Sequence, residues 1–340
     1  MKVCIFQSWG GIGDLCMTVP VIHQIRATHP SASFVVVVKG PAQAALLNSA
    51  PYVSKILHFP DERNLHGLLR FFWSLRRMHL DAIFISTGTR AFYAILIYLL
   101  CNIRVRIGDG LKYRFAYTHN YTKPLPIHRV DRQLSMVELW TGSPTTLDLS
   151  LPIDPVAATA AATILESNNL IDRQFLVIHP GSNKGEDMRQ KRIPIELALQ
   201  TARVLSRESK IKIVIILGPD DLDLEDRFHL NDKDITVIAR VSLDETKYIL
   251  SKASGFIGSD SSLGHIASAF DVPTVTLIGP TNPIVSLPRG RGAKIVQSNE
   301  AFACRPCWFT PLQGKCPHSL RCLTTIKVED VVEAANVKIG

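Results

Sequence analysis

The sequence predicts an α/β fold with two domains, each built on a parallel β-sheet that helices cover on both faces. Short apolar runs rich in Val, Ile and Phe alternate with longer segments of helical pattern. Such continuous runs are typical of parallel strands buried on both faces. At 340 residues the chain is long for one hydrophobic core and comfortable for two. Residues 142–155 are rich in Ser, Thr, Pro and Asp, the composition of a linker.

The first half opens on an apolar strand that leads into a glycine-rich turn and a helix. The unbroken valine run of residues 34–38 is that of a strand buried on both sides. The apolar run of residues 91–101 is too short to cross a bilayer, so we interpret it as a buried helix. The strands expected here are 3–7, 34–38, 55–58, 82–86 and 104–107, and the helices are 15–28, 42–48, 66–78 and 91–101.

The second half shows the same alternation without a detectable sequence repeat. The expected strands are 175–179, 212–217, 236–238, 255–258 and 274–278, and the helices are 194–206, 243–251, 264–270 and 328–335. We place the domains at residues 1–153 and 154–340, the second with a Cys-rich segment at 304–322. Two Rossmann-like halves of this kind would face each other across a cleft, with ligands outside the carboxyl ends of the strands.

The composition is globular, with 46% hydrophobic and 20% charged residues. No secretory signal is evident, so we expect a cytoplasmic protein. The net charge of +8 is confined to residues 1–150, which hold 16 Lys and Arg against 8 Asp and Glu. This asymmetry favours an anionic partner for the first half, and an ordinary solvated surface is the alternative.

Two loops that follow strands carry candidate site residues. Residues 8–14 place three glycines, including Gly13, before Asp14 at the start of a helix, where Asp14 could be a general base or only a helix cap. The spacing is not that of a dinucleotide-binding fingerprint. In the second half, the loop after the strand 175–179 contains Ser182 and Asn183 and leads to Lys191. Hydroxyls, amides and a lysine suit a diphosphate, although an exposed basic loop would look similar.

A third loop, residues 257–265, ends a strand at small residues and feeds a helix, so its amides would point at an anion. Its polar members are Asp260, Ser261 and Ser262. His265 by itself is more often a structural histidine than a catalyst. Glu225, in an acidic turn, is a possible ribose contact or simply exposed.

Taken together, these segments resemble glycosyltransferase family 9, the bacterial lipopolysaccharide heptosyltransferases. The resemblance lies in the order and spacing of Gly13-Asp14, Arg104-Val105-Arg106-Ile107-Gly108, His179-Pro180-Gly181, Lys191-Arg192-Ile193-Pro194, Asp260-Ser261-Ser262-Leu263-Gly264-His265 and Gly279-Pro280-Thr281. It implies a GT-B fold, an NDP-sugar donor such as ADP-heptose, and inversion at the anomeric carbon without a catalytic cofactor or metal. The acceptor it implies is lipopolysaccharide core. A protein or another glycan as acceptor, a different NDP-sugar, or a nucleotide-sugar epimerase are the alternatives.

The resemblance also implies roles for single residues. Asp14 resembles the base that deprotonates the acceptor, and Lys191 the cation that stabilises the leaving diphosphate. Asp260 resembles a donor-sugar contact. The donor-binding set is completed by Gly13, Ser182, Asn183, Glu225, Ser261, Ser262, Leu263, Gly264 and His265.

The chain departs from the family near the donor. Ile193 stands where members commonly carry Trp, and Ser262 where they carry Gly. The loop 182–190 is also unusual in its charged residues, Lys184, Glu186, Asp187 and Arg189. These departures leave the sugar and the base of the donor open.

Four of the seven cysteines form the pattern C-x2-C-x8-C-x5-C, close to a structural metal knuckle, with His318 inside the loop. The pattern predicts a structural metal on Cys304, Cys307, Cys316 and Cys322, and the family resemblance implies zinc or iron, with free thiols or disulfides as alternatives.

Arginines surround the aromatic residues 71–73 of the helix expected at 66–78. We expect Arg63, Arg76 and Arg77 to bind an anionic glycan or glycolipid acceptor. The same segment is amphipathic and basic, as helices at membrane surfaces are, so peripheral contact with the inner membrane is an alternative. A further alternative is that the Phe and Trp side chains pack on the sheet while the arginines are ordinary solvated residues. No nucleic-acid recognition module is visible, and no nucleic-acid partner is expected.

Overall fold

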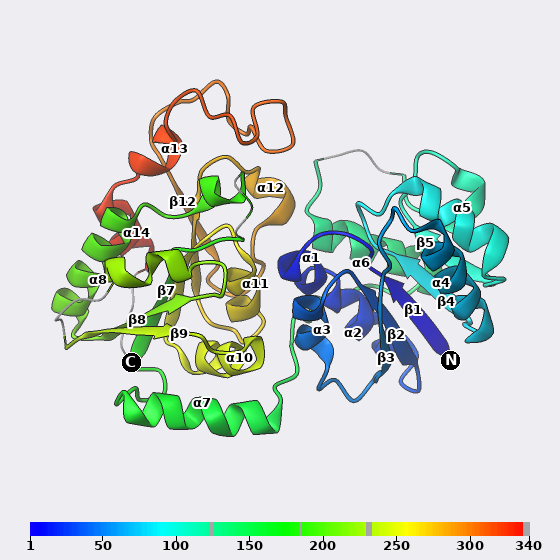
Figure 1. Ribbon diagram of the computed structural model, residues 1–340, viewed down its shortest axis with the longest axis horizontal. Coiled ribbons are helices and arrows are strands. Elements are labelled where there is room, and N and C mark those ends of the chain that lie inside the picture. The colour runs from blue at the N-terminus through cyan, green and yellow to red at the C-terminus, as the bar shows by residue number, and fades with distance from the viewer. Residues whose placement is uncertain (123–125, 184, 186, 229–232, 336–340) are drawn as a thin grey trace. The chain divides into compact units, whose positions relative to one another are not determined.

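The computed structural model describes residues 1–122, 126–183, 185, 187–228 and 233–335. These residues form two compact units, Met1–Pro152 and Ile153–Gly340. Each unit has its own parallel sheet with helices on both faces (Figure 1). The predicted α/β class with two doubly wound parallel sheets is therefore confirmed.

The first unit contains six parallel strands in the order β3-β2-β1-β4-β5-β6. This is the order of a dinucleotide-binding Rossmann sheet, in which the direction of progress reverses between β1 and β4. The strands are β1 (Lys2–Phe6), β2 (Ser33–Val38), β3 (Val53–His58), β4 (Ala82–Ile85), β5 (Val105–Gly108) and β6 (His119–Asn120).

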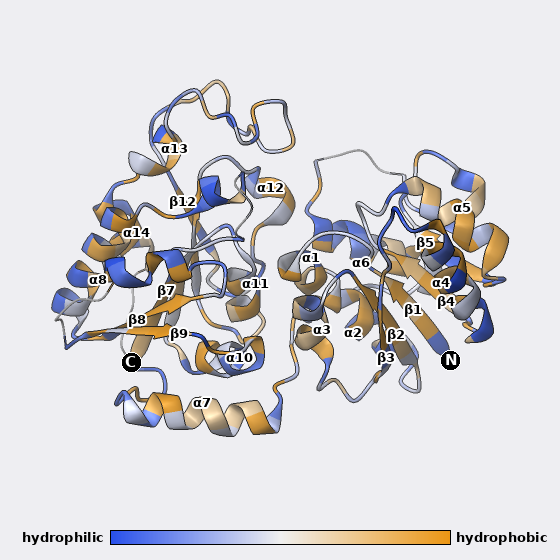
Figure 2. Cartoon of the chain, viewed as in Figure 1, coloured by the Kyte–Doolittle hydropathy of each residue, from blue (hydrophilic) through white to orange (hydrophobic). Residues whose placement is uncertain are grey.

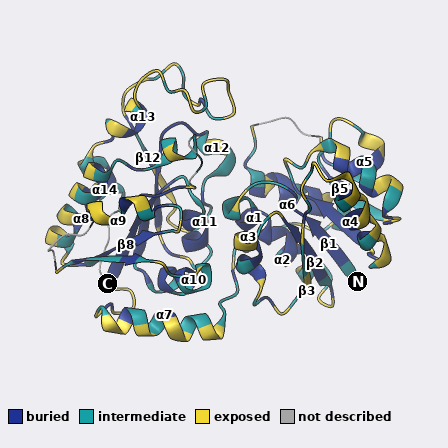
Figure 3. Ribbon diagram, viewed as in Figure 1, coloured by how far each residue is buried: buried dark blue, intermediate teal, exposed yellow. Residues whose placement is uncertain are grey.

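Helices cover both faces of this first sheet. On one face, α4 (Leu65–Arg77) and α5 (Ala91–Leu100) pack on the apolar side chains of β1, β2 and β4. On the other, α2 (Val19–Thr28) packs against α6 (Arg129–Thr141), and α1 (Ile12–Cys16) against α3 (Pro41–Leu47). The central strands β1, β2 and β4 are apolar and buried (Figures 2 and 3).

Two expectations for the first unit were wrong in detail. The helix expected at 15–28 is two helices, because Pro20 in the first turn of α2 has no N–H to continue the preceding turn. The run interpreted as a buried helix, α5, buries only one side. Its Phe92, Tyr98 and Leu99 are 55%, 43% and 61% exposed.

The second unit repeats the first topology, although its sequence does not. Its order is β12-β11-β10-β7-β8-β9, which reverses between β7 and β10 as the first sheet does between β1 and β4. The strands are β7 (Phe175–His179), β8 (Lys212–Leu217), β9 (Ile235–Ala239), β10 (Gly255–Ser259), β11 (Thr274–Ile278) and β12 (Lys294–Gln297).

In this unit α8 (Ile195–Ser209) packs against α14 (Val328–Ala335), and α10 (Leu243–Lys252) packs against α7 (Pro155–Ser167) and α11 (Ser262–Ser268). Helices α6 and α7 and strands β6 and β12 were not predicted from the sequence. Helix α7 begins where the predicted linker ends, because Asp154 caps it by accepting from the N–H groups of Val156 and Ala157 at 3.0 and 2.9 Å. The remaining short helices are η1 (Arg114–Ala116), η2 (Met188–Lys191), η3 (Leu222–Leu224), α9 (Glu225–Phe228), α12 (Pro283–Ser286) and α13 (Arg321–Thr324).

Within the described ranges, every helix is too short or too polar to cross a lipid bilayer.

Candidate active site

Both sheets have a switch point, where the strand order reverses and ligands of such folds bind beyond the carboxyl ends of the strands. In the first unit, Gly13 and Asp14 follow β1. In the second, Ser182 and Asn183 follow β7, while residues 260–265 follow the neighbouring β10. Most predicted site residues therefore lie at the carboxyl edge of their own sheet.

Asp14 lies in α1 and acts as the helix cap that its position suggested, while its role as a base stays a prediction. Its Oδ2 accepts a hydrogen bond from the Gly11 N–H at 2.9 Å, which caps the helix. Its Oδ1 forms an ion pair with Arg129. Gly10, at φ +78°, lies so close to this carboxylate that a side chain there would overlap it. A carboxylate offers about four acceptor positions, so Asp14 keeps room to accept a further proton donor while two contacts hold it in place.

Arg129, the ion-pair partner of Asp14, was not predicted from the sequence. It is the first residue of α6, and its guanidinium lies 4.7 Å from the ring centroid of Trp9. The Trp9 indole in turn donates to the Thr87 carbonyl at 2.9 Å, which joins the loops after β1 and β4. Arg129 and Asp14 are 115 positions apart, so no local spacing signals their contact.

The predicted acceptor arginines do not gather around Asp14. Arg63 precedes α4 and is exposed at the carboxyl edge of the sheet. Arg76 and Arg77 end α4 near the start of β1. There the Lys2 Nζ donates to the Met78 carbonyl at 3.3 Å. The five residues of β1 separate this edge from the edge of Asp14 by about 16 Å.

In the second unit, Lys191 and Asp260 contact each other. The Lys191 Nζ lies 3.1 Å from the Asp260 Oδ2, and the two side chains are 11% and 10% exposed. The same Nζ lies 4.4 Å from the ring centroid of Trp308. Trp308 was not predicted, and it belongs to the Cys-rich segment, which thus reaches Lys191.

A buried charged network fixes the loop that carries Lys191. The Asp221 Oδ1 accepts from the Ser182 N–H at 3.0 Å and from the Arg192 guanidinium at 2.9 Å. Asp221 approaches so closely that Gly181 has no space for a side chain. The His179 ring lies beside it, and its Nδ1 donates to the Ile216 carbonyl at 2.9 Å. Burial lowers the pKa of His179, and the Asp221 charge opposes this only in part.

Two hydroxyls beyond β10 and β11 are candidates for binding a ligand. Ser261, the N-cap of α11, and Thr281 both have buried side-chain oxygens with no hydrogen-bond partner among the described residues. Their strands are neighbours in the sheet. The first amides of α11, from Ser262 to Gly264, also have no carbonyl within the helix to bind. Leu263, Gly264 and His265 are themselves buried, so their backbone is what a ligand could reach.

The remaining donor candidates have partners of their own. Glu225 forms an ion pair with Arg240 at 2.5 Å, which occupies part of its carboxylate. The Asn183 side chain accepts from the Gly185 N–H at 3.1 Å. Asp187 accepts from the Gln313 amide at 2.5 Å, a second contact between this loop and the Cys-rich segment. Lys184 and Glu186 lie outside the described residues.

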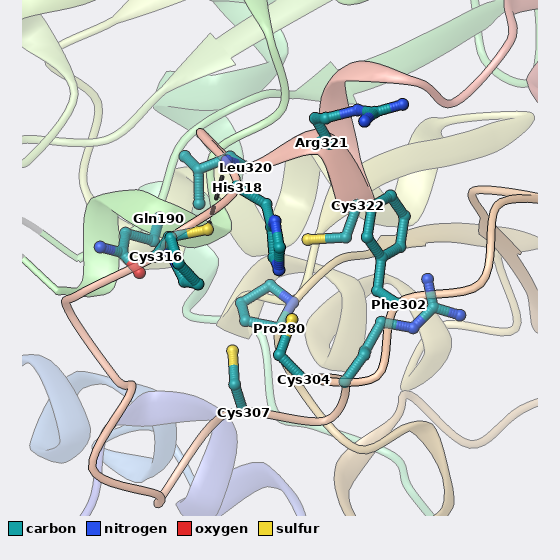
Figure 4. A pocket seen from close by; sticks show the side chains of 12 residues that line it. Gln190, Pro280, Phe302, Cys304, Cys307, Cys316, His318, Leu320, Arg321 and Cys322 are labelled. Carbon is teal, nitrogen blue, oxygen red and sulfur yellow. Dashed lines mark hydrogen bonds between the residues drawn. The ribbon is translucent and has the colours of Figure 1, made fainter.

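The four clustered cysteines line one pocket with His318, Gln190 and Pro280 (Figure 4). All seven cysteines are free thiols, so the disulfide alternative finds no support. In the part of the chain that the structure describes, no three His, Cys, Asp or Glu side chains are arranged to hold a metal ion. Burial and the neighbouring thiols of Cys316, Cys307 and Cys304 raise the pKa of Cys322 to about 11.

Comparison with known proteins agrees with this architecture. The family model described as glycosyltransferase family 9 (heptosyltransferase) matches residues 68–310. Lipopolysaccharide heptosyltransferase 1 of Pseudomonas aeruginosa is 41% identical over 71 residues, which are 21% of this chain and 19% of that protein. The match thus spans about a fifth of the curated relative.

Two solved structures cover nearly the whole chain. A glycosyltransferase family 9 protein from Veillonella parvula superposes with a TM-score of 0.80 at 19% identity, over 98% of this chain and 96% of the other. E. coli heptosyltransferase WaaC with ADP-2-deoxy-2-fluoro heptose superposes with a TM-score of 0.71 at 19% identity, over 98% of both chains. At such identities these structures show the fold, which is of the GT-B type.

Proposed function

Because the chain belongs to glycosyltransferase family 9 (heptosyltransferase), we propose that it is an inverting glycosyltransferase that transfers heptose from ADP-heptose to lipopolysaccharide core. The observation that carries the proposal is the Lys191–Asp260 pair at the switch point of the second sheet. The pair lies in the same unit as Ser261 and Thr281. The side-chain hydroxyls of these two residues are buried and have no hydrogen-bond partner among the described residues. The E. coli relative bound to an ADP-heptose analogue supports the choice of donor.

On the donor side, the diphosphate replaces Asp260 as the anion that contacts the Lys191 ammonium. The α11 amides, Ser261 and Thr281 then bind the phosphate oxygens, because amides at a helix start favour negative charge. Asp260, once released, accepts from a hydroxyl of the donor sugar. As the bond from the anomeric carbon to the diphosphate breaks, negative charge grows on the leaving ADP, and Lys191 stabilises that charge.

On the acceptor side, Asp14 removes the proton of the attacking hydroxyl. The new bond forms on the face of the anomeric carbon opposite the leaving ADP, so the configuration inverts. The proton ends on Asp14, and the leaving electron pair ends on ADP. Arg129 holds the Asp14 carboxylate in place between turnovers. The first unit is thus proposed to take the acceptor and the second the donor.

A donor screen tests the proposal. ADP-, GDP- and UDP-sugars are titrated into the enzyme by calorimetry, and products with a Kdo–lipid A acceptor are identified by mass spectrometry. Binding of ADP-heptose and gain of one heptose mass by the acceptor support the proposal. Conversion of an NDP-sugar without acceptor would identify an epimerase instead. Transfer to a peptide or another glycan alone would retain the transferase and refute the lipopolysaccharide acceptor.

We propose in addition that the cysteines of the 304–322 segment hold a structural zinc or iron. Thiolates are ligands that both metals accept, and the four side chains line one pocket. The described side chains do not converge as a preformed site, so binding has to draw the thiols together. No step of the transfer involves this metal.

A further inference from the structure

Two neighbouring helices of the first unit expose large apolar side chains. On α4, Leu65, Leu69 and Trp73 are 69%, 46% and 58% exposed. Their spacing of four residues places them on one side of the helix. On α5, Phe92 and Leu99 are 55% and 61% exposed, and a spacing of seven again places them on one side. Both helices bury their opposite sides on the same sheet, so these side chains point away from it.

The two exposed sides form one surface. Helices α4 and α5 pack against each other, and the Arg76 guanidinium of α4 donates to the Leu100 carbonyl of α5 at 3.3 Å. Figure 3 shows exposed residues on the outer sides of both helices. Phe115, 64% exposed, extends the surface through an edge contact with Tyr98 of α5 at 5.8 Å. We call Leu65, Leu69, Trp73, Phe92, Leu99 and Phe115 the α4–α5 surface.

Positive charge is concentrated in the same segment. Residues 63–116 contain nine Lys and Arg but two Asp and Glu, which is seven of the eight net charges of the chain. Some of these cations lie over exposed aromatic rings. The Arg77 guanidinium is 4.6 Å from the Trp73 ring centroid, and that of Arg106 is 5.2 Å from Tyr98. Apolar contact and cationic charge are therefore available at the same place.

From these observations we infer that the α4–α5 surface docks the first unit onto an anionic phospholipid bilayer. A bilayer surface offers apolar chains beneath negatively charged headgroups, and helices with apolar and basic residues side by side bind there. Arginine stems and aromatic rings suit this boundary because each has an apolar body and a polar end. A soluble anionic glycan would complement the charge but would leave six large apolar side chains in water.

This inference also accounts for the placement of Arg76 and Arg77, which lie at the edge of the sheet away from Asp14. It extends the proposed function by naming the surface on which a lipid-linked acceptor would be met. The docking can nevertheless be measured without donor, acceptor or transfer. Failure to bind lipid and failure to transfer sugar are therefore separate results.

Vesicle flotation of the full chain tests the inference. Vesicles of phosphatidylcholine alone are compared with vesicles in which about a third of the lipid is phosphatidylglycerol. At 0.1 M salt we expect at least roughly tenfold tighter binding to the anionic vesicles than to the neutral ones. This preference should be lost near 1 M salt, where the Debye length is about 3 Å. Equal binding to both vesicles, or binding to neither, overturns the inference.

Two variants then separate charge from apolar contact. Arg70→Gln with Arg77→Gln is expected to abolish the preference for anionic vesicles. Leu69→Ser with Trp73→Ser is expected to weaken binding at every salt concentration. The matched controls are Arg203→Gln with Arg207→Gln and Val156→Ser with Ile171→Ser, which change exposed residues of the second unit. ADP affinity and the melting temperature confirm that each variant is folded. If the surface variants float as the controls do, the α4–α5 surface does not bind the bilayer.

Discussion

The ammonium of Lys191 and the carboxylate of Asp260 lie 3.1 Å apart, with only about a tenth of each side chain exposed. A partly buried ion pair gives up hydration on both partners, and removing one partner leaves the other uncompensated. Under the proposed mechanism, the free protein already holds the cation that stabilises the leaving diphosphate, neutralised by the residue proposed to contact the sugar. Donor binding would then replace one anion by another at Lys191, so the two residues should respond differently to substitution.

Lys191→Ala should weaken ADP binding, because a hydrogen bond to a charged group contributes about 1.5–3 kcal/mol. Asp260→Ala should leave ADP affinity unchanged or higher and should weaken binding of the ADP-sugar. Calorimetric titrations of ADP and of ADP-heptose into both variants measure this difference. Lys191→Arg keeps the charge and serves as the matched control. Equal ADP affinity in wild type and Lys191→Ala would remove Lys191 from the diphosphate site.

Trp308 is expected to position the Lys191 ammonium through its ring. Cation–π contacts contribute roughly 0.5–2 kcal/mol, so Trp308→Ala should lower ADP affinity by less than Lys191→Ala does. Trp308→Phe should recover part of the loss. Phe309→Ala is the control, because Phe309 is the neighbouring residue and is 76% exposed. An ADP affinity in Trp308→Ala that matches the control contradicts the positioning role.

Asp14→Asn should lower turnover by about 10²- to 10⁴-fold, because the amide cannot take the acceptor proton. ADP-heptose affinity should stay near that of wild type, since Asp14 lies in the first unit and the donor residues in the second. Steady-state kinetics and calorimetry together measure the split. Asp172→Asn, on the surface of the second unit, is the matched control. Near-normal turnover in a folded Asp14→Asn would rule out the base.

Stability should fall as the pH drops below about 6.5, the ordinary pKa of histidine. Burial lowers the pKa of His179 in the folded protein. There is therefore a pH range in which this histidine is protonated in the unfolded chain but not in the folded one. The unfolding free energy therefore decreases toward acid pH. Urea unfolding of wild type and His179→Asn between pH 7.5 and 5.5 measures the slope. We expect a flatter slope in His179→Asn and an unchanged one in the exposed control, His66→Asn.

Purified protein should contain about one equivalent of zinc or iron, and Cys304→Ser with Cys307→Ser should lose both the metal and thermal stability. Elemental analysis and thermal melts, with chelator-treated wild type beside them, make the comparison. Protein prepared without chelator and free of metal would leave the cysteines as ordinary thiols.

The sequence predicted the strongly apolar elements well. Strands 175–179, 212–217 and 274–278 were correct to the residue, because a strand buried on both faces is one continuous apolar run. The sequence did not predict the edge strands β6 and β12, because both strands are short and their residues are partly exposed. Helix α7 was not predicted because it is rich in alanine and only weakly amphipathic.

For the candidate site, sequence and resemblance together pointed to the loops after β1, β7 and β10. They could not indicate Arg129 or Trp308, whose contacts join residues far apart in the chain. They also grouped Arg63 with Arg76 and Arg77, because a sequence range does not show that α4 carries its two ends to opposite edges of the sheet.

The strand order of the first unit also bears on how the chain is made. β1 is synthesised first but lies in the middle of its sheet, so it must wait for β2 and then β4 before both of its sides are paired. Helix α6, which brings Arg129 to Asp14, follows later, yet still before residue 153. Domains generally fold as units in the order of their synthesis. We therefore expect the nascent chain to assemble the Asp14–Arg129 pair before synthesis of the second unit is complete.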